Sequence, residues 1–235
     1  MKLSTIAKAS LALSILTTGV VTTNTQAVEA APYAYGGSSY SNSFYKNISN
    51  DAKSLYTYYS KHSFDFRYQT GYSDSQTIEV QDPYSYQFNV ISLVGKNRNQ
   101  FYQTQLNNID VFVVNEGDGR QATNYSVGGI TKSNQYSHYG PVASPQLSVT
   151  NGHKRDNIRF NIDKEEISLK QIDFKIRHQL INHYSLYKNG KKSGKIVIEM
   201  YHGPSHTINL DSKLSAERMG DVVDSRQIKN ISIEL

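Results

Sequence analysis

The chain has 235 residues, which is enough for two modest domains, and its 19% charged and 37% hydrophobic residues exclude both an intrinsically disordered chain and a bundle of membrane helices. The sequence contains no cysteine, so disulfides, thiol catalysis and thiolate metal sites are excluded, and burial of apolar surface has to hold the fold together. The formal net charge of +5 favours acidic partners such as sialylated glycans, acidic receptor tails or membrane surfaces, or it serves only solubility.

The N-terminal residues 1 to 30 have the features of a secretory signal peptide. A lysine-containing start precedes a short apolar run at 11 to 21, and small residues at 28 to 30, or alternatively 25 to 27, supply a cleavage site. The apolar run is shorter than the roughly 20 residues that a membrane-spanning helix needs. We therefore expect a secreted chain without stable membrane insertion. Residues 31 to 48 are rich in Tyr, Ser, Gly and Asn and are predicted to form a flexible arm.

Residues 49 to 140 are predicted to form a first domain, with one short helix followed by five short strands. The helix is expected at Asp51–Ser60, with Ser49 or Asn50 as its N-cap. Aromatic and β-branched runs separated by turn residues predict the strands at 64–68, 77–80, 86–93, 109–114 and 125–130. Such a pattern fits a compact barrel of the oligonucleotide/oligosaccharide-binding (OB) type, and it fits a small β-sandwich equally well.

Residues 141 to 235 are predicted to form a second domain that combines a sheet with one long helix. The turn-rich segment 135–145 is expected to connect the two domains. Strands are predicted at 147–150, 155–162, 196–200, 207–210 and 228–235. An amphipathic helix that packs across a mixed sheet buries the apolar surfaces of both, which is the β-grasp arrangement.

The helix is predicted within Lys164–Tyr187, the longest stretch with a helical period. Apolar residues fall at three- and four-residue steps and define one buried stripe: Leu169, Ile172, Ile176, Leu180, Tyr184 and Tyr187. Ser168 and Gln171 have the spacing of a capping box, and Asn189-Gly190 is the expected stop. Asp173 and Arg177 are expected to form an ion pair on the exposed side, worth only about 0.2–0.5 kcal/mol.

The same stretch carries a family resemblance. Eight positions match the C-terminal signature of the staphylococcal and streptococcal superantigen toxins: Lys164, Ile167, Ile172, Asp173, Arg177, Leu180, Leu186 and Tyr187. With the C-terminal sequence RMGDVVDSRQIKNISIEL, the region most closely resembles the staphylococcal superantigen-like proteins. The resemblance implies an OB barrel followed by a β-grasp domain. Val127-Gly128-Gly129-Ile130-Thr131 looks like a degraded copy of the family's other signature, with Val127 where true superantigens usually carry Tyr.

Motifs for catalysis, metal binding and nucleic-acid binding are not found in the sequence. It lacks G-x-S-x-G, H-E-x-x-H and P-loop patterns, so we predict that the chain is not an enzyme and needs no cofactor. His202 and His206 flank a turn, but the His-x-Asp pair of zinc-dependent superantigens is absent, so we expect no metal site. Basic residues are dispersed, which argues against nucleic acid.

Anionic glycans are the more specific candidate ligands. In the family that the chain resembles, several superantigen-like proteins bind sialylated glycans beside the helix of the β-grasp domain. Lys175, Arg177 and His178 are expected on the exposed side of that helix and are the candidate glycan-binding residues, although they do not match the glycan-binding members residue by residue. Two further basic clusters, 188–195 and 153–155, are either solvated hairpins or part of an anion-binding surface.

Three functional hypotheses follow from the resemblance. The first is a secreted, non-enzymatic immune-evasion protein that binds a host immune receptor or an immune glycoprotein, with neutrophil receptors and sialylated glycans as candidates, and acts as a monomer or weak homodimer. The second is a true T-cell superantigen that cross-links class II molecules and T-cell receptors. The third is an inhibitor of host secreted proteases. The altered first signature and the missing His-x-Asp pair favour the first hypothesis.

Overall fold

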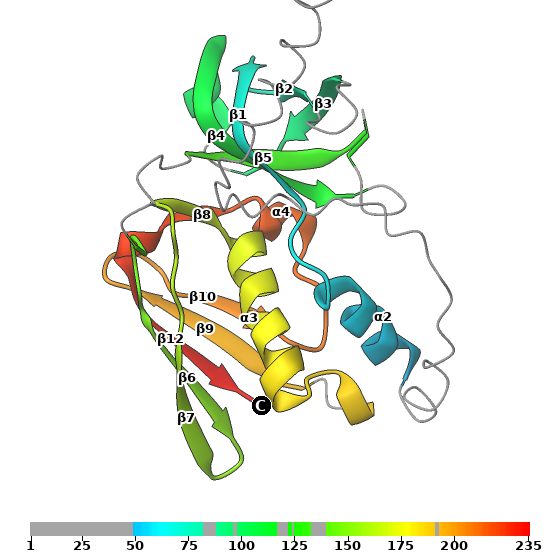
Figure 1. The fold of residues 1–235 in the computed structure, drawn as a ribbon, viewed down its shortest axis with the longest axis vertical. Helices are drawn as coiled ribbons and strands as arrows, with labels where there is room; N and C mark the ends of the chain where they lie inside the picture. The colour runs from blue at the N-terminus through cyan, green and yellow to red at the C-terminus, as the bar shows by residue number, and fades with distance from the viewer. Residues whose placement is uncertain are drawn as a thin grey trace, which may run out of the picture.

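The computed structural model describes residues 49–81, 88–95, 98–116, 122–123, 125–132, 140–190 and 193–235. The predicted signal peptide and arm lie outside the described residues, as do residues 135–139 of the predicted connection. Within the described ranges a barrel is followed by a helix-backed sheet (Figure 1). Among the described helices, none combines the length and the apolar character required to cross a membrane.

Helix α2 (Asn50–Tyr59) precedes the barrel and begins where the sequence predicts. The Ser49 hydroxyl accepts a hydrogen bond from the Ala52 N–H, which satisfies one of the free amides of the first turn. Figure 1 shows α2 beside α3, on the side of that helix away from the sheet. Leu55 and Tyr59 are buried in the same hydrophobic cluster as the sheet of the second domain. The helix therefore packs with the second domain, although its sequence precedes the first.

Five strands close into a barrel, which resolves the choice between a barrel and a sandwich. Their bounds are β1 (Asp65–Ser73), β2 (Thr77–Gln81), β3 (Phe88–Leu93), β4 (Thr104–Asn115) and β5 (Val127–Lys132). Their spatial order is β1-β2-β3-β5-β4, with a short 3-10 helix η2 (Arg98–Phe101) between β3 and β4. All pairs are antiparallel except β3 with β5. The OB-fold prediction is confirmed.

Two consecutive glycines in β5 allow the barrel to close. A Cβ atom on Gly128 would lie 2.0 Å from the Phe112 carbonyl oxygen, and one on Gly129 would lie 2.4 Å from the Phe112 ring. Only hydrogen side chains fit at these two positions, because Phe112 of the paired strand β4 approaches them closely. The glycines of the degraded signature therefore have a packing role.

The second domain is a five-stranded mixed sheet covered on one face by a helix (Figure 1). Its strands are β6 (Gln146–Asn151), β7 (Lys154–Arg159), β9 (Lys195–Met200), β10 (His206–Asn209) and β12 (Ile228–Glu234), in the order β10-β9-β12-β6-β7. The central pair, β12 with β6, is parallel. Ile231 and Ile233 alternate with polar residues and are buried, as the period of two predicts. The β-grasp prediction is confirmed.

Several short elements lack a detectable sequence period and were not predicted. They are β8 (Glu166–Ser168), which pairs with β11 (Val222–Asp224), the one-turn helix α4 (Ala216–Met219), and the 3-10 helices η4 (Lys188–Gly190) and η5 (Ser225–Gln227). Elements of three or four residues are too short for a hydrophobic period to appear.

Helix α3 (Leu169–Tyr184) begins as predicted and ends earlier than predicted. The capping box of Ser168 and Gln171 is present in both directions. Five of the six stripe residues are fully buried, and Tyr184 is half-buried. The predicted stop at Asn189-Gly190 is wrong, because Ser185 adopts the left-handed conformation (φ 56°) and ends the helix. This earlier turn carries Leu186 and Tyr187 into the core.

A polar contact between the domains is built around the start of α3. Lys164 donates hydrogen bonds to Asp110 of β4 (2.9 Å) and Thr131 of β5 (2.8 Å). Lys170 is fully buried and pairs with Glu116 at 2.9 Å. Because a buried cation is stable only when it is paired, these contacts hold the barrel against the helix in one arrangement. The signature position Lys164 thus connects the two domains.

Candidate anion-binding site

Arg177 lies at the centre of a buried network on α3. Its Nε donates to Asp173 Oδ1 at 2.6 Å, and Tyr59 from α2 donates to the other carboxylate oxygen at 2.8 Å. The guanidinium also donates to the Tyr187 hydroxyl and lies over the Tyr59 ring, 4.2 Å from its centroid. Its remaining hydrogen bonds go to three backbone carbonyls, of Asn209, Leu210 and Ser212. The side chains of Asp173 and Arg177 are both 0% exposed.

This network corrects two sequence-based predictions. The Asp173–Arg177 pair is buried and is not a surface pair, and Arg177 is not available to a glycan. The cause is α2, which covers the side of α3 that a helix–sheet pattern alone leaves to solvent. Burial raises the pKa of the Tyr187 hydroxyl to about 12, so it remains a protonated donor to the Leu210 carbonyl. Arg177 therefore stabilises the fold.

Lys175, in contrast, lies on the exposed side of α3. Its Nζ donates to the Asn161 carbonyl and lies 5.4 Å from the centroid of the Phe160 ring. The pKa of Lys175 is lowered first by partial burial and further by Arg67 of β1, while Asp163 opposes the change. Arg67 is exposed. Arg67 of the barrel thus acts electrostatically on Lys175 of the second domain.

His178 is one helical turn from Lys175 and contacts a second histidine. The ring of His62, in the link between α2 and β1, lies 4.7 Å from the His178 ring, centroid to centroid, at an interplanar angle of 31°. Burial lowers the pKa of His178, and His62 lowers it further, while the carbonyls of Tyr59 and Ser60 at the end of α2 oppose the change. Nδ1 of His178 is buried and has no hydrogen-bond partner among the described residues.

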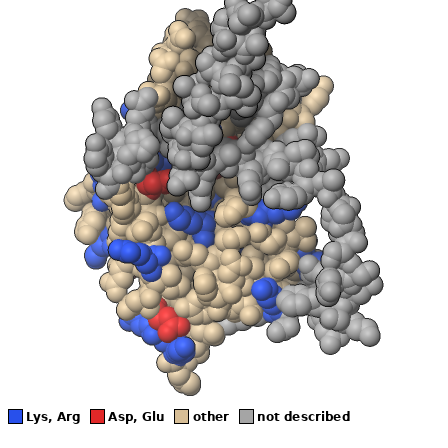
Figure 2. Space-filling model, viewed as in Figure 1, with Lys and Arg blue, Asp and Glu red and all other residues tan. Residues whose placement is uncertain are grey.

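These four residues form a cationic strip, defined here as Arg67, Lys175, His178 and His62. Figure 1 shows the chain between α2 and β1 passing beside α3, so residues of that segment come close to residues of the helix. On the face seen in Figure 2, which includes α3, Lys and Arg surface is more extensive than Asp and Glu surface. Two predicted residues, Lys175 and His178, thus belong to the strip. The contribution of Arg67 and His62 was missed because it comes from a segment more than 100 residues away in sequence.

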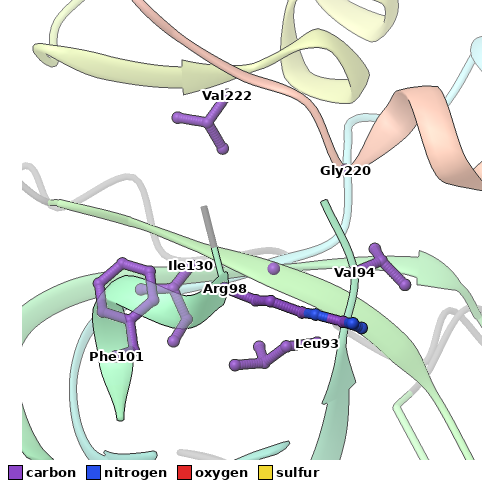
Figure 3. Close-up of a pocket in the computed structure, with 8 residues that line it drawn as sticks. Leu93, Val94, Arg98, Phe101, Ile130, Gly220 and Val222 are labelled. Atoms are coloured by element: carbon purple, nitrogen blue, oxygen red, sulfur yellow. The ribbon is translucent and has the colours of Figure 1, made fainter. Parts of the chain in front are cut away.

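A hollow between the two domains is too small for an organic ligand. It is lined by Leu93, Val94, Arg98, Phe101, Gly129, Ile130, Gly220 and Val222. Figure 3 shows the barrel side chains facing Val222 of β11 across this space. Its volume of about 10 Å³ leaves room for roughly one water molecule. This hollow is therefore not a candidate ligand site.

The other predicted basic and histidine groups do not form a comparable arrangement. Lys195 pairs with Glu234 at 3.1 Å and Lys154 with Asp156 at 3.8 Å, both at the surface. His202 is exposed. Across the ranges that the structure describes, no group of three or more His, Asp or Glu residues is placed to hold a metal ion. Surface ion pairs of this kind contribute little to stability.

Comparison with known proteins identifies the family. A family model for the staphylococcal superantigen-like OB-fold domain matches residues 53–134, and one for the β-grasp domain of staphylococcal and streptococcal toxins matches residues 145–235. Staphylococcal superantigen-like 1 of Staphylococcus aureus strain Newman is 39% identical over 243 residues, covering 100% of both chains. The chain belongs to the staphylococcal superantigen-like family. The predicted family membership is confirmed.

Other superantigen-like proteins show the same agreement. Superantigen-like protein 11 of S. aureus strain Newman is 38% identical over 240 residues, with complete coverage of both chains. The solved structure of SET3, a superantigen-like protein from S. aureus, has a TM-score of 0.67 at 31% identity and covers 81% of this chain and 98% of its own. Superantigen-like toxins are secreted exotoxins, and the model that matches residues 145–235 describes a toxin domain.

One solved relative contains a ligand. The staphylococcal superantigen-like protein SSL5, complexed with sialyl Lewis X, has a TM-score of 0.66 at 31% identity and covers 78% of this chain and 99% of its own. Sialyl Lewis X ends in a sialic acid, whose carboxylate is an anion at neutral pH. A relative with this fold thus binds a ligand of the charge type that the cationic strip suits.

Proposed function

We propose that this chain is a secreted, non-catalytic protein that binds host immune glycoproteins, and that the cationic strip binds the carboxylate of a terminal sialic acid. The observation that carries the proposal is the complex of the related SSL5 with sialyl Lewis X. In this chain Lys175 and Arg67 supply charge from the two sides of the strip. A guanidinium forms planar, charge-assisted hydrogen bonds with a carboxylate, so Arg67 takes the role that the sequence assigned to Arg177.

The outer face of the barrel supports contact with the protein part of such a partner. Tyr72 of β1 and Val90 of β3 flank Glu79 of β2 in one cross-strand row, and Phe88 lies beside that row on the same face. Phe88 is 61% exposed and Tyr72 52% exposed. In strands that alternate buried and exposed residues, the outward positions are normally polar. Exposed aromatic residues at these positions are typical of protein-binding surfaces.

Binding to immobilised sialyl Lewis X, measured by surface plasmon resonance on the full chain, tests the proposal. The wild type should bind sialyl Lewis X and not its desialylated counterpart, and added salt should weaken binding. Lys175→Glu should weaken binding by at least about fivefold, because it reverses a charge next to the carboxylate. Lys154→Glu is the matched control, since Lys154 is an exposed lysine on β7 that lies outside the strip. It should bind within about twofold of the wild type.

Two outcomes would overturn the proposal. Equal binding of the sialylated and desialylated glycans would remove sialic acid as the recognised group, and undiminished binding by Lys175→Glu would place the site elsewhere. Strong proliferation of T cells with antigen-presenting cells, caused by the purified chain, would favour a true superantigen instead.

A further inference from the structure

The cationic strip contains two imidazoles beside a lysine and an arginine. Histidine is the side chain whose charge is most sensitive to pH near neutrality, whereas lysine and arginine are cations there. The rings of His62 and His178 are 4.7 Å apart, and His62 is exposed while His178 is half-buried beneath it. A ligand on the strip therefore meets two fixed charges and two that depend on pH.

We propose that anion binding to the strip is coupled to proton uptake by the His62–His178 pair, so that binding strengthens as the pH falls from about 7.5 to 5.5. This inference rests on the proposed function for the identity of the ligand, sialyl Lewis X, but the coupling itself applies to any anion on the strip. Such coupling makes anion binding depend on pH, which the charges of Lys175 and Arg67 alone do not do near neutrality.

The surroundings of the pair explain why a ligand is needed for both protons to bind. His62 is the titratable group that acts on His178, and the carbonyls of Tyr59 and Ser60 at the end of α2 also act on it. Lys175 lies one helical turn away on α3, and Asp163 and Arg67 act on Lys175. Two imidazolium rings in contact, next to these cations, repel one another. A bound carboxylate supplies the missing negative charge and relieves that repulsion.

The two histidines differ in what they contribute. His62 is exposed and reaches solvent, so its N–H groups can donate to a bound anion. His178 has a buried Nδ1 without a partner and lies against the carbonyls that end α2. A protonated imidazole near a helix C-terminus is favoured by the helix dipole. His178 therefore acts from below the surface, by adding charge under the ligand and fixing the His62 ring.

Isothermal titration calorimetry of the full chain with sialyl Lewis X tests the coupling. Affinity should be about threefold to tenfold higher at pH 5.5 than at pH 7.5, because each added exposed charge contributes a fraction of a kcal/mol. A sialic carboxylate remains ionised over this range, so only the protein titrates. Titrations at pH 6.5 in two buffers of different ionisation enthalpy should show net proton uptake. In the double variant His62→Gln/His178→Gln both effects should disappear, whereas His202→Gln, an exposed histidine outside the strip, should retain them.

The possible results distinguish a failure of the pH coupling from a failure of the proposed function. Binding with the same affinity at both pH values, or a pH dependence that persists in the double variant, would overturn the coupling. Absence of binding at every pH would overturn the proposed ligand. In that case the coupling is tested with inorganic sulfate as the probe, by nuclear magnetic resonance titration of the imidazoles. Sulfate should raise the pKa of both rings, and unchanged titration curves would overturn the coupling as well.

Discussion

Replacement of Arg177 by alanine is expected to destabilise the whole C-terminal domain. The substitution removes the cationic partner of Asp173, which stays fully buried, and the hydrogen bonds that Arg177 donates to the carbonyls of Asn209 and Ser212. The Leu210 carbonyl keeps only the hydrogen bond from the Tyr187 hydroxyl. The substitution also removes the charge over the Tyr59 ring. If Arg177 formed only a surface ion pair with Asp173, its replacement would hardly change the free energy of unfolding. The experiment therefore distinguishes a buried structural arginine from the surface ion pair that helical spacing predicted.

The expected magnitude follows from the burial of both partners. Removal of one member of a buried pair typically costs about 3–5 kcal/mol, because an uncompensated charge remains in the interior. Replacement of both members by apolar residues costs less for the same reason. The double variant Arg177→Met/Asp173→Leu should therefore be more stable than the sum of the two single effects predicts.

Urea unfolding followed by circular dichroism measures these differences. Lys175→Ala, two residues away on the exposed side of α3, is the control and should cost less than about 1 kcal/mol. A loss below about 1 kcal/mol for Arg177→Ala would refute the buried-network account. Additivity of the two substitutions in the double variant would show that the pair does not act as a unit.

Three further predictions concern other parts of the fold. Leu180→Asp should cost several kcal/mol in the free energy of unfolding, because it places an unpaired charge in the core; a cost near zero would mean that the stripe is not buried. Gly128→Ala should lower the melting temperature of the chain, since its Cβ would lie 2.0 Å from the Phe112 carbonyl oxygen, and an unchanged melting temperature would contradict the close approach of β4 to Gly128. Without ligand, the stability contributed by His178 should fall as the pH drops below about 6.5. Its pKa is lower in the folded chain, so the unfolded chain binds more protons there. His178→Gln should flatten the dependence of the urea midpoint on pH, and an unchanged slope would exclude this group.

Much of the fold could be predicted from the sequence because its elements have clear local signals. The capping box at Ser168 and the alternation of Ile231 and Ile233 depend on neighbouring residues only. Most of the described strands overlap the predicted ones, with bounds that shift by up to five residues, as at the end of β1 and the start of β4. The short pair β8–β11 carries no such signal and forms because the chain around α3 brings the two segments together.

The packing of α2 against α3 could not be predicted from local sequence signals. The sequence of α2 predicts a helix, but nothing in it indicates that Tyr59 will bond to Asp173, 114 residues away. That contact converts the predicted outer side of α3 into an interior surface and buries Arg177. The same packing brings His62 and Arg67 to the edge of α3 and completes the cationic strip. The unpredicted position of α2 thus explains why Arg177 is not a surface residue and why His62 and Arg67 were not predicted as part of the cationic strip.

The proposed glycan site is tested most directly by mapping sialyl Lewis X on the isotopically labelled full chain with amide and imidazole chemical shifts. We predict that the largest ligand-dependent shifts will lie at Arg67, Lys175, His178 and His62, and that the desialylated glycan will not produce them. Shifts that cluster away from this strip, or an equal response to both glycans, would contradict an anion-binding site on α3.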